Sequence, residues 1–266
     1  MTSVAILGAA GRMGAALISS IRAYENLKLG AAVEQSGNPN VGLDSGTVSG
    51  CQPNGILITD DISAAIASVD VAIDFTFHTA VPETAMLVKQ HGKAYILGTT
   101  GLTTEELIVV QTAAQTVPVM MAPNMSLGVN LLLSLVKQAA SILTEGYDAE
   151  IVEMHHRHKM DAPSGTALAL AKAVAAGREV NLEDVVCYGR EGMTGERKPE
   201  TIAIHAVRGG DVVGDHTVMF AADGERVEIT HKATGRGCLA GGALRAAAWI
   251  VTKEPGFHSM RDMLGI

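Results

Sequence analysis

Short apolar runs alternate with stretches of helical spacing through the first half of the chain. The first run, at 3–7, is followed by a glycine-rich loop and a helical pattern at 15–24. Continuous apolar runs of this length are typical of strands that are buried on both faces of a parallel sheet. Further strands are expected at 27–34, 69–75, 93–97 and 117–121, with helices at 81–91 and 105–116. This order predicts an α/β fold with a Rossmann-like, doubly wound parallel sheet.

The pattern changes after Pro123. Long apolar helices are expected at 127–144 and 164–176, and strands at 149–158, 201–207, 212–221 and 226–232. Glycine-containing segments at 209–211 and 223–224 resemble hairpin turns. We therefore expect a second, α+β domain with a mixed or antiparallel sheet at 127–236. A closing helix at 237–251 is expected to pack back, so that 237–266 completes a dinucleotide-binding domain at 1–126.

The composition limits the classes of protein to which the chain can belong. Of its 266 residues, 47% are apolar and 18% charged, which is typical of a globular protein. The net charge of −8 argues against a nucleic-acid partner, whose phosphates favour a basic surface. Three cysteines far apart form neither a disulfide framework nor a metal pair, so a reducing cytoplasm is expected. Gly8 and Arg12 interrupt the first apolar run, so neither a signal peptide nor a membrane span is expected.

A loop with the sequence GAAGRMG at 8–14 joins the first expected strand to the first expected helix. Glycines at this point let the backbone approach a pyrophosphate, whose charge a helix N-terminus stabilises. Glu34 ends the second expected strand, where a carboxylate can accept hydrogen bonds from an adenosine ribose. An ordinary glycine turn and a solvated glutamate are the alternative interpretation. The combined order of strand, loop, helix and acid favours dinucleotide binding.

The residue after Glu34 bears on the choice of cofactor. A basic side chain there would pair with the 2′-phosphate of NADPH, but the position holds the neutral Gln35. The charge of Glu34 itself repels such a phosphate, and Arg12 could offset this repulsion in part. We therefore expect NADH to be used at least as well as NADPH.

Proton-bearing side chains are concentrated at 153–166, with the sequence EMHHRHKMDAPSGT. The helix that begins after Ser164 offers backbone N–H groups to a carboxylate. Such a cluster can also be a solvated patch of a strand, or a zinc site made by its histidines and Asp161. No cysteine pair or HExxH-type helix accompanies it. Binding and protonation of an anionic substrate, without a metal, is the favoured interpretation.

Several motifs resemble those of the 4-hydroxy-tetrahydrodipicolinate reductase (dihydrodipicolinate reductase) family. They are GAAGRMG, DFT at 74–76, GTTG at 98–101, APNMSLGVN at 122–130 and EMHHRHKMDAPSGTAL at 153–168. VGDHTV at 213–218 and EITHKATGR at 228–236 extend the resemblance over essentially the whole chain. The long histidine motif is specific, whereas the glycine loop alone is not. The family reduces the cyclic product of pyruvate and aspartate semialdehyde, on the diaminopimelate route to lysine.

The resemblance implies roles for the matching residues. His155 corresponds to the general acid and Lys159 to the proton donor, while His156, Gly165 and Thr166 correspond to ligands of the substrate carboxylates. Many family members carry arginine where this chain has Gln35, which puts tight binding of NADPH in doubt. The residues implied to hold NADH or NADPH are Gly8, Ala9, Ala10, Gly11, Arg12, Met13, Glu34, Gln35, Gly98, Thr99, Thr100, Ala122, Pro123, Asn124 and Met125.

The implied reaction is the reduction of 4-hydroxy-2,3,4,5-tetrahydrodipicolinate, a small dicarboxylate, to 2,3,4,5-tetrahydrodipicolinate. Hydride is delivered to C4 after the 4-hydroxyl leaves as water. The implied assembly is a homotetramer joined through the sheet of the second domain. A dehydrogenase of the aspartate or homoserine type would leave the histidine motif unexplained. A non-catalytic NAD(P) sensor would not require His155 and Lys159.

Overall fold

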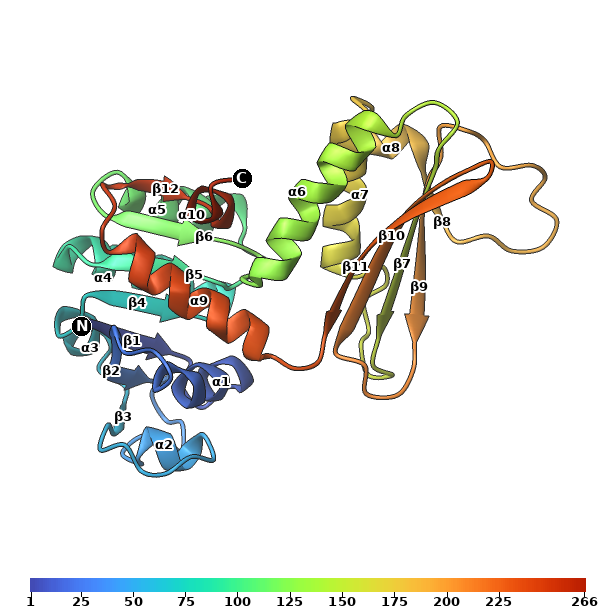
Figure 1. Ribbon diagram of the computed structural model, residues 1–266. Helices are drawn as coiled ribbons and strands as arrows, with labels where there is room; N and C mark the ends of the chain where they lie inside the picture. The colour runs from blue at the N-terminus through green and yellow to red at the C-terminus, as the bar shows by residue number, and fades with distance from the viewer. The chain divides into compact units, whose positions relative to one another are not determined.

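In the computed structural model, which covers residues 1–266, the chain forms two compact units (Figure 1). Unit 1 contains Met1–Leu127 and Arg236–Ile266, and unit 2 contains Gly128–Gly235. Unit 1 is thus assembled from both ends of the chain, whereas unit 2 is continuous. None of the helices combines the length and the apolar character that a membrane crossing requires.

Unit 1 is built on a seven-stranded parallel sheet with the order β12-β6-β5-β4-β1-β2-β3. This order confirms the predicted Rossmann-like fold, and it reverses between β1 and β4, the point where such folds bind ligands. The strands are β1 Thr2–Leu7, β2 Leu27–Val33, β3 Ile58–Thr59, β4 Val71–Asp74, β5 Ala94–Leu97, β6 Pro118–Met121 and β12 Gly256–His258.

Helices cover both faces of this sheet, because the apolar side chains of each strand alternate between two cores. Val4 and Ile6 of β1 pack in one core with α1 and α9, and Ala5 and Leu7 pack in the other with α3, α4 and α5. The helices of unit 1 are α1 Arg12–Ile21, α2 Ser45–Val48, α3 Ile62–Ala67, η1 His78–Ala80, α4 Val81–His91, α5 Thr104–Ala114, α9 Gly237–Ile250 and α10 Met260–Leu264.

Unit 2 contains a mixed five-stranded sheet with the order β11-β10-β7-β9-β8. One face packs against the apolar sides of α6 and α7, around buried residues such as Ile151 and Phe220. The strands are β7 Asp148–His155, β8 Val186–Tyr188, β9 Ile202–Arg208, β10 Gly214–Ala222 and β11 Glu225–Ala233, and the helices are α6 Leu127–Ile142, α7 Gly165–Gly177 and α8 Leu182–Val185.

The two expected hairpin turns of unit 2 have different outcomes. Asp223-Gly224 joins the antiparallel strands β10 and β11 as a two-residue turn, with Gly224 at φ +86°, which confirms that prediction. The prediction of a hairpin at 209–211 is wrong, because β9 and β10 both pair with β7 and not with each other. Glycine marks a change of direction there, but it does not specify which strand becomes the neighbour.

The strand expected at 149–158 ends earlier, at His155. Beyond this residue the backbone bonds to the β9–β10 connection, from the Arg157 N–H to the Gly210 carbonyl at 3.2 Å. A turn follows, in which the Lys159 N–H donates to the His156 carbonyl at 3.1 Å. Residues 156–159 therefore do not alternate between two faces of a strand.

Candidate functional site

The glycine loop lies between β1 and α1, at the carboxyl edge of the parallel sheet. Gly8 has φ +77°, and a Cβ atom at Gly14 would lie 2.2 Å from the Gly8 carbonyl oxygen, so both positions need glycine. No side chain caps the N-terminus of α1, which begins at Arg12. Its first N–H groups can therefore bind a pyrophosphate, and the loop fits a dinucleotide.

Glu34 directly follows β2 and contacts this loop. Its Oε1 accepts a hydrogen bond from the Ala10 N–H at 2.9 Å, and its Oε2 accepts one from the Asn38 side-chain amide at 3.2 Å. The carboxylate is thus held in place beside the loop, with lone pairs left for further donors such as ribose hydroxyls. Gln35 is the next residue, and its N–H lies 3.3 Å from Glu34 Oε2.

Asp74 is a buried carboxylate at the end of β4, beside the glycine loop's strand β1. It accepts hydrogen bonds from Thr76, from the Tyr95 hydroxyl at 2.6 Å and from the Thr99 hydroxyl at 3.1 Å. Burial, and next the charge of Asp74, raise the pKa of Tyr95 well above its ordinary value. Asp74 therefore fixes the start of the predicted cofactor segment at Gly98, Thr99 and Thr100. An acid that ends an otherwise apolar strand was the available sequence signal.

The other predicted cofactor segment, Ala122 to Met125, follows β6 at the same edge of the sheet. The Asn124 side-chain oxygen accepts a hydrogen bond from the Ser126 N–H at 2.9 Å. Met125 is buried in the core of unit 1, and a Cβ atom at Gly242 of α9 would lie 1.7 Å from its carbonyl oxygen. Met125 therefore has only its backbone to offer to a ligand. All predicted cofactor residues lie in unit 1, after β1, β2, β5 or β6.

In unit 2, the end of β7 carries a buried pair, Glu153 and His155. His155 Nδ1 lies 2.6 Å from Glu153 Oε2, and the same carboxylate accepts two hydrogen bonds from Arg208 and one from the Ser164 N–H. Burial raises the pKa of Glu153, but Arg208, His155 and Ser164 together lower it by more, so it stays below its ordinary value. The Glu-x-His spacing placed both side chains on one face of a strand, whereas no local pattern indicated Arg208.

His216 of β10 lies edge-on to His155, with ring centroids 5.1 Å apart. Its Nε2 lies 3.0 Å from the hydroxyl oxygen of Ser164. Burial, followed by the nearby His155, lowers the pKa of His216 from 6.5 to about 4, so this ring is neutral at neutral pH. His216 occurs in the VGDHTV motif but was not assigned a role from the sequence.

The remaining residues of the motif lie in the connection between β7 and α7. Lys159 forms an ion pair with Asp161 at 2.9 Å, which lowers the pKa of the Asp161 carboxyl. The rings of His156 and His158 lie 6.2 Å apart, and His156 Nδ1 is buried without a hydrogen-bond partner. No group of three or more His, Cys, Asp or Glu side chains is placed to hold a metal ion.

Gly165 and Thr166 are the first residues of α7. Ser164 caps this helix, because its hydroxyl accepts a hydrogen bond from the Ala167 N–H at 3.2 Å. A Cβ atom at Gly165 would meet nothing within 4 Å, so the space beside this first turn is open. The start of α7 can therefore receive an anion.

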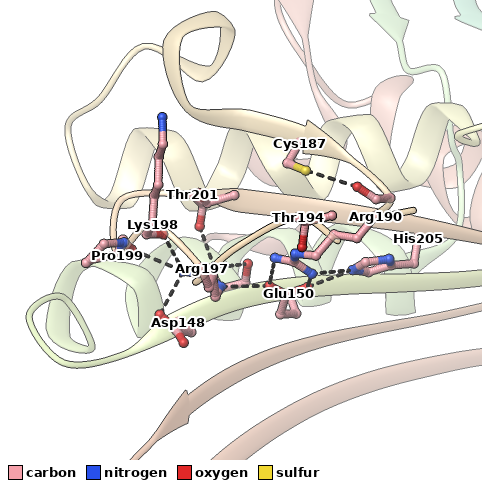
Figure 2. Close-up of polar contacts among 12 residues, drawn as sticks. Asp148, Glu150, Cys187, Arg190, Thr194, Arg197, Lys198, Pro199, Thr201 and His205 are labelled. Carbon is pink, nitrogen blue, oxygen red and sulfur yellow. Dashed lines mark hydrogen bonds and ion pairs between the residues drawn. The ribbon is translucent and has the colours of Figure 1, made fainter. Parts of the chain in front are cut away.

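A second charged cluster surrounds Glu150, on the other face of the unit 2 sheet (Figure 2). Arg190 donates two hydrogen bonds to its carboxylate, at 3.0 and 2.7 Å, and Arg197 and His205 bind it at 2.9 and 2.6 Å. Arg197 also donates to Asp148 and to several carbonyls, among them that of Thr201. Burial raises the pKa of Glu150, but these partners together lower it to about 2. Both arginines belong to the connection between β8 and β9.

Comparison with known proteins adds independent information. Residues 2–125 match the family model described as dihydrodipicolinate reductase, N-terminus, and residues 128–264 match dihydrodipicolinate reductase, C-terminus. The chain is 49% identical to a 4-hydroxy-tetrahydrodipicolinate reductase of Anaeromyxobacter dehalogenans (strain 2CP-1 / ATCC BAA-258), over 100% of this chain and 98% of the relative. It is 46% identical to the 4-hydroxy-tetrahydrodipicolinate reductase of Nitrosomonas europaea, over 99% of this chain and 98% of the relative.

Among solved structures, the chain is similar to a dipicolinate-bound dihydrodipicolinate reductase from Paenisporosarcina sp. TG-14. The TM-score is 0.79 at 25% sequence identity, and the match covers 99% of both chains. Sequence and structure comparisons therefore agree over both units.

Proposed function

The chain belongs to the dihydrodipicolinate reductase family, and from that premise we propose its reaction. It reduces 4-hydroxy-2,3,4,5-tetrahydrodipicolinate to 2,3,4,5-tetrahydrodipicolinate with NADH or NADPH and with loss of water, in the cytoplasm, on the diaminopimelate route to lysine. Unit 1 binds the nucleotide and unit 2 binds the dicarboxylate ring.

One observation carries the assignment of the substrate site. Glu153 binds His155 Nδ1 and the Ser164 N–H through its two oxygens, so a proton-bearing ring lies next to the start of α7. A ring dicarboxylate needs both a proton donor and donors for its carboxylates. His155 serves as general acid, and His156, Gly165 and Thr166 bind the carboxylates.

Lys159 supplies positive charge and a proton to the substrate. Its ammonium forms an ion pair with Asp161. A substrate carboxylate or a departing hydroxyl competes with Asp161 for that ammonium. The reduced nicotinamide supplies the hydride when the cofactor is bound.

The choice of cofactor depends on the two residues that follow β2, Glu34 and Gln35. Glu34 is fixed beside the glycine loop and is followed by the neutral Gln35. NADH is therefore used at least as well as NADPH. Replacement of Gln35 by Arg is expected to raise kcat/KM for NADPH about tenfold, because a 2′-phosphate gains one charge-assisted contact. Steady-state kinetics with both cofactors measure the change.

Four copies of the chain assemble through the face of the unit 2 sheet that is opposite α6 and α7. The face opposite α6 and α7 carries Val152, Met154, Val207 and Met219; Met154 of β7 pairs with Val207 of β9, and Val207 is 42% exposed. Apolar side chains on one face of a sheet suit a symmetric contact between copies. Light scattering after gel filtration is expected to give four times the chain mass, and Met219→Lys is expected to reduce it.

A coupled assay tests the reaction. Pyruvate, aspartate semialdehyde and the enzyme that condenses them are mixed with the protein, and oxidation of NADH and of NADPH is followed separately. We expect both to be oxidised, and His155→Ala and Lys159→Ala each to lower kcat by 10²–10⁴-fold. Oxidation of neither cofactor would overturn the proposal.

Ligand binding separates an enzyme from a cofactor sensor. Pyridine-2,6-dicarboxylate is a flat analogue of the ring, so it should raise the melting temperature further once NADH is present. A sensor would respond to NADH alone.

A further inference from the structure

Glu153 is an ionisable side chain with no exposed surface, and all of its hydrogen-bonding capacity is used. Oε1 accepts from the Ser164 N–H at 3.0 Å and from Arg208 Nη2 at 2.9 Å. Oε2 accepts from His155 Nδ1 at 2.6 Å and from Arg208 Nη1 at 2.8 Å. A carboxylate has about four acceptor sites, so none is left for a substrate or a further proton. Glu153 therefore acts only through the groups that it holds.

The register of the sheet brings these partners together. His155 pairs with Arg208 across β7 and β9, and Glu153 pairs with His216 across β7 and β10. Arg208 also donates to the Asp161 carbonyl at 2.6 Å, so its guanidinium is held by the Asp161 backbone as well as by Glu153. The guanidinium balances the carboxylate in a bidentate pair, which keeps Glu153 ionised.

An ionised carboxylate can only accept, so the hydrogen between Glu153 and His155 belongs to Nδ1 of the ring. The nitrogen that gains or loses a proton is then Nε2. Gly214 leaves room at this atom, because a Cβ atom there would lie 3.0 Å from His155 Nε2. His216 lies beside the ring as a neutral group and places no second positive charge there.

We propose that Glu153, balanced by Arg208, is a positioning residue that fixes the Nδ1–H tautomer and the ring plane of His155, so that His155 exchanges its proton at Nε2. This inference rests on the proposed role of His155 as general acid. A purely structural link between β7, β9 and α7 would use the same Arg208 and Ser164 contacts, but it would have no consequence for the proton on His155.

The first test compares Glu153→Gln with Glu150→Gln. Both changes remove a carboxylate of β7 that binds a histidine at 2.6 Å, but Glu150 lies on the opposite face. We expect kcat to fall by 10–100-fold in Glu153→Gln, as for other groups that orient an imidazole, with KM for NADH unchanged. We expect Glu150→Gln to retain kcat.

The pH profile is a readout that a structural role does not move. Glu153→Gln removes a negative charge beside the ring, so the alkaline limb of kcat should move to lower pH. The charged and titratable groups around His155 and His216 are Glu153, Lys159, Asp161, Arg208 and His231. All except Glu153 remain in this variant, so the shift reports on Glu153.

The double variant Glu153→Gln/Arg208→Gln guards against loss of folding. It removes the buried charge together with its counter-charge, so thermal stability should recover relative to Glu153→Gln while kcat stays low. A folded double variant with kcat within about threefold of the wild type, and with an unmoved alkaline limb, would overturn the inference.

Histidine ¹⁵N NMR tests the inference without turnover. The His155 signals are assigned by their loss in His155→Ala. The wild type should show a protonated Nδ1 and an unprotonated Nε2 in the neutral ring, and Glu153→Gln should populate the other tautomer. A wild-type His155 with its proton on Nε2 overturns the inference even if the enzyme is active. If the wild type oxidises neither cofactor, the proposed function fails, and the tautomer alone decides this inference.

Discussion

Glu150 and Glu153 lie three residues apart on β7, on opposite faces of one sheet, and their partners are closely alike. Each binds one arginine through two hydrogen bonds and one histidine at 2.6 Å. The partners of Glu150 include two arginines from the irregular β8–β9 connection, so this carboxylate holds a loop (Figure 2). The partners of Glu153 lie at the ends of β7, β9 and α7, which pack in the core of unit 2. The same chemistry therefore anchors a loop on one face and orients a single ring on the other.

Removal of one arginine from each cluster should give the largest contrast. Arg208→Met leaves the fully buried Glu153 without its counter-charge, which is expected to cost about 3–5 kcal/mol. Arg190→Met leaves Glu150 with Arg197 and His205, and the cluster is partly exposed, so the expected cost is about 1 kcal/mol or less. Urea unfolding followed by circular dichroism measures both. Equal losses of unfolding free energy in the two variants would contradict the distinction between the Glu153 and Glu150 clusters.

Mild acid should lower the folding stability first through His216, which lies on the same face of the sheet as Glu153. Folding holds this ring neutral with a pKa of about 4, against 6.5 for a free histidine. The unfolded chain therefore binds a proton that the folded chain refuses, and stability falls as the pH drops from 6.5 towards 4, by about 3 kcal/mol. His216→Gln lacks this loss. Calorimetry across this range should show the melting temperatures of the two proteins changing differently, and parallel curves would refute the assignment.

Stronger acid should lower the folding stability further, through protonation of Glu150 on the opposite face. The pKa of Glu150 is about 2 in the folded chain and ordinarily 4.5, so its contribution is complete above pH 4.5 and is lost as the pH falls through 2. Screening limits this contribution to about 1 kcal/mol. The stability difference between wild type and Glu150→Gln should be constant above pH 4.5 and shrink below it. If the stability difference already shrinks between pH 6.5 and 4.5, a group other than Glu150 causes it.

Elements with local signals were predictable from the sequence. Helix α4 runs over Val81–His91 as expected, because proline stands in its first turn and Gly92 ends it with φ +63°. The short strands β3, β8 and β12 were not predicted, because two or three residues carry no periodicity. The 209–211 connection shows the same limit, since a turn signal is local and strand pairing is not.

The candidate site likewise contains residues that a local sequence pattern indicates and residues that only strand pairing brings in. Its proton-bearing residues are adjacent in sequence, so the cluster at 153–166 could be recognised at once, whereas the roles of His155 and Lys159 came from the resemblance to the family. Arg208 lies 55 residues from Glu153, and the contact depends on the register of β7 with β9. Asp74 was visible only as part of a motif, and its role as a shared acceptor appears when β4 and β5 are placed side by side.

The two-segment construction of unit 1 imposes an order on synthesis at the ribosome. The core that contains β1 and α1 also requires six buried residues of α9, which are Ala240, Ala243, Leu244, Ala246, Ala247 and Ile250. Unit 2 is continuous and complete once residue 235 has emerged, whereas unit 1 waits for the last thirty-one residues, Arg236–Ile266. Domains generally fold as units. The segment that precedes unit 2 is therefore the last to acquire its finished core, and a nascent chain truncated before α9 would carry a folded unit 2 behind an unfinished unit 1.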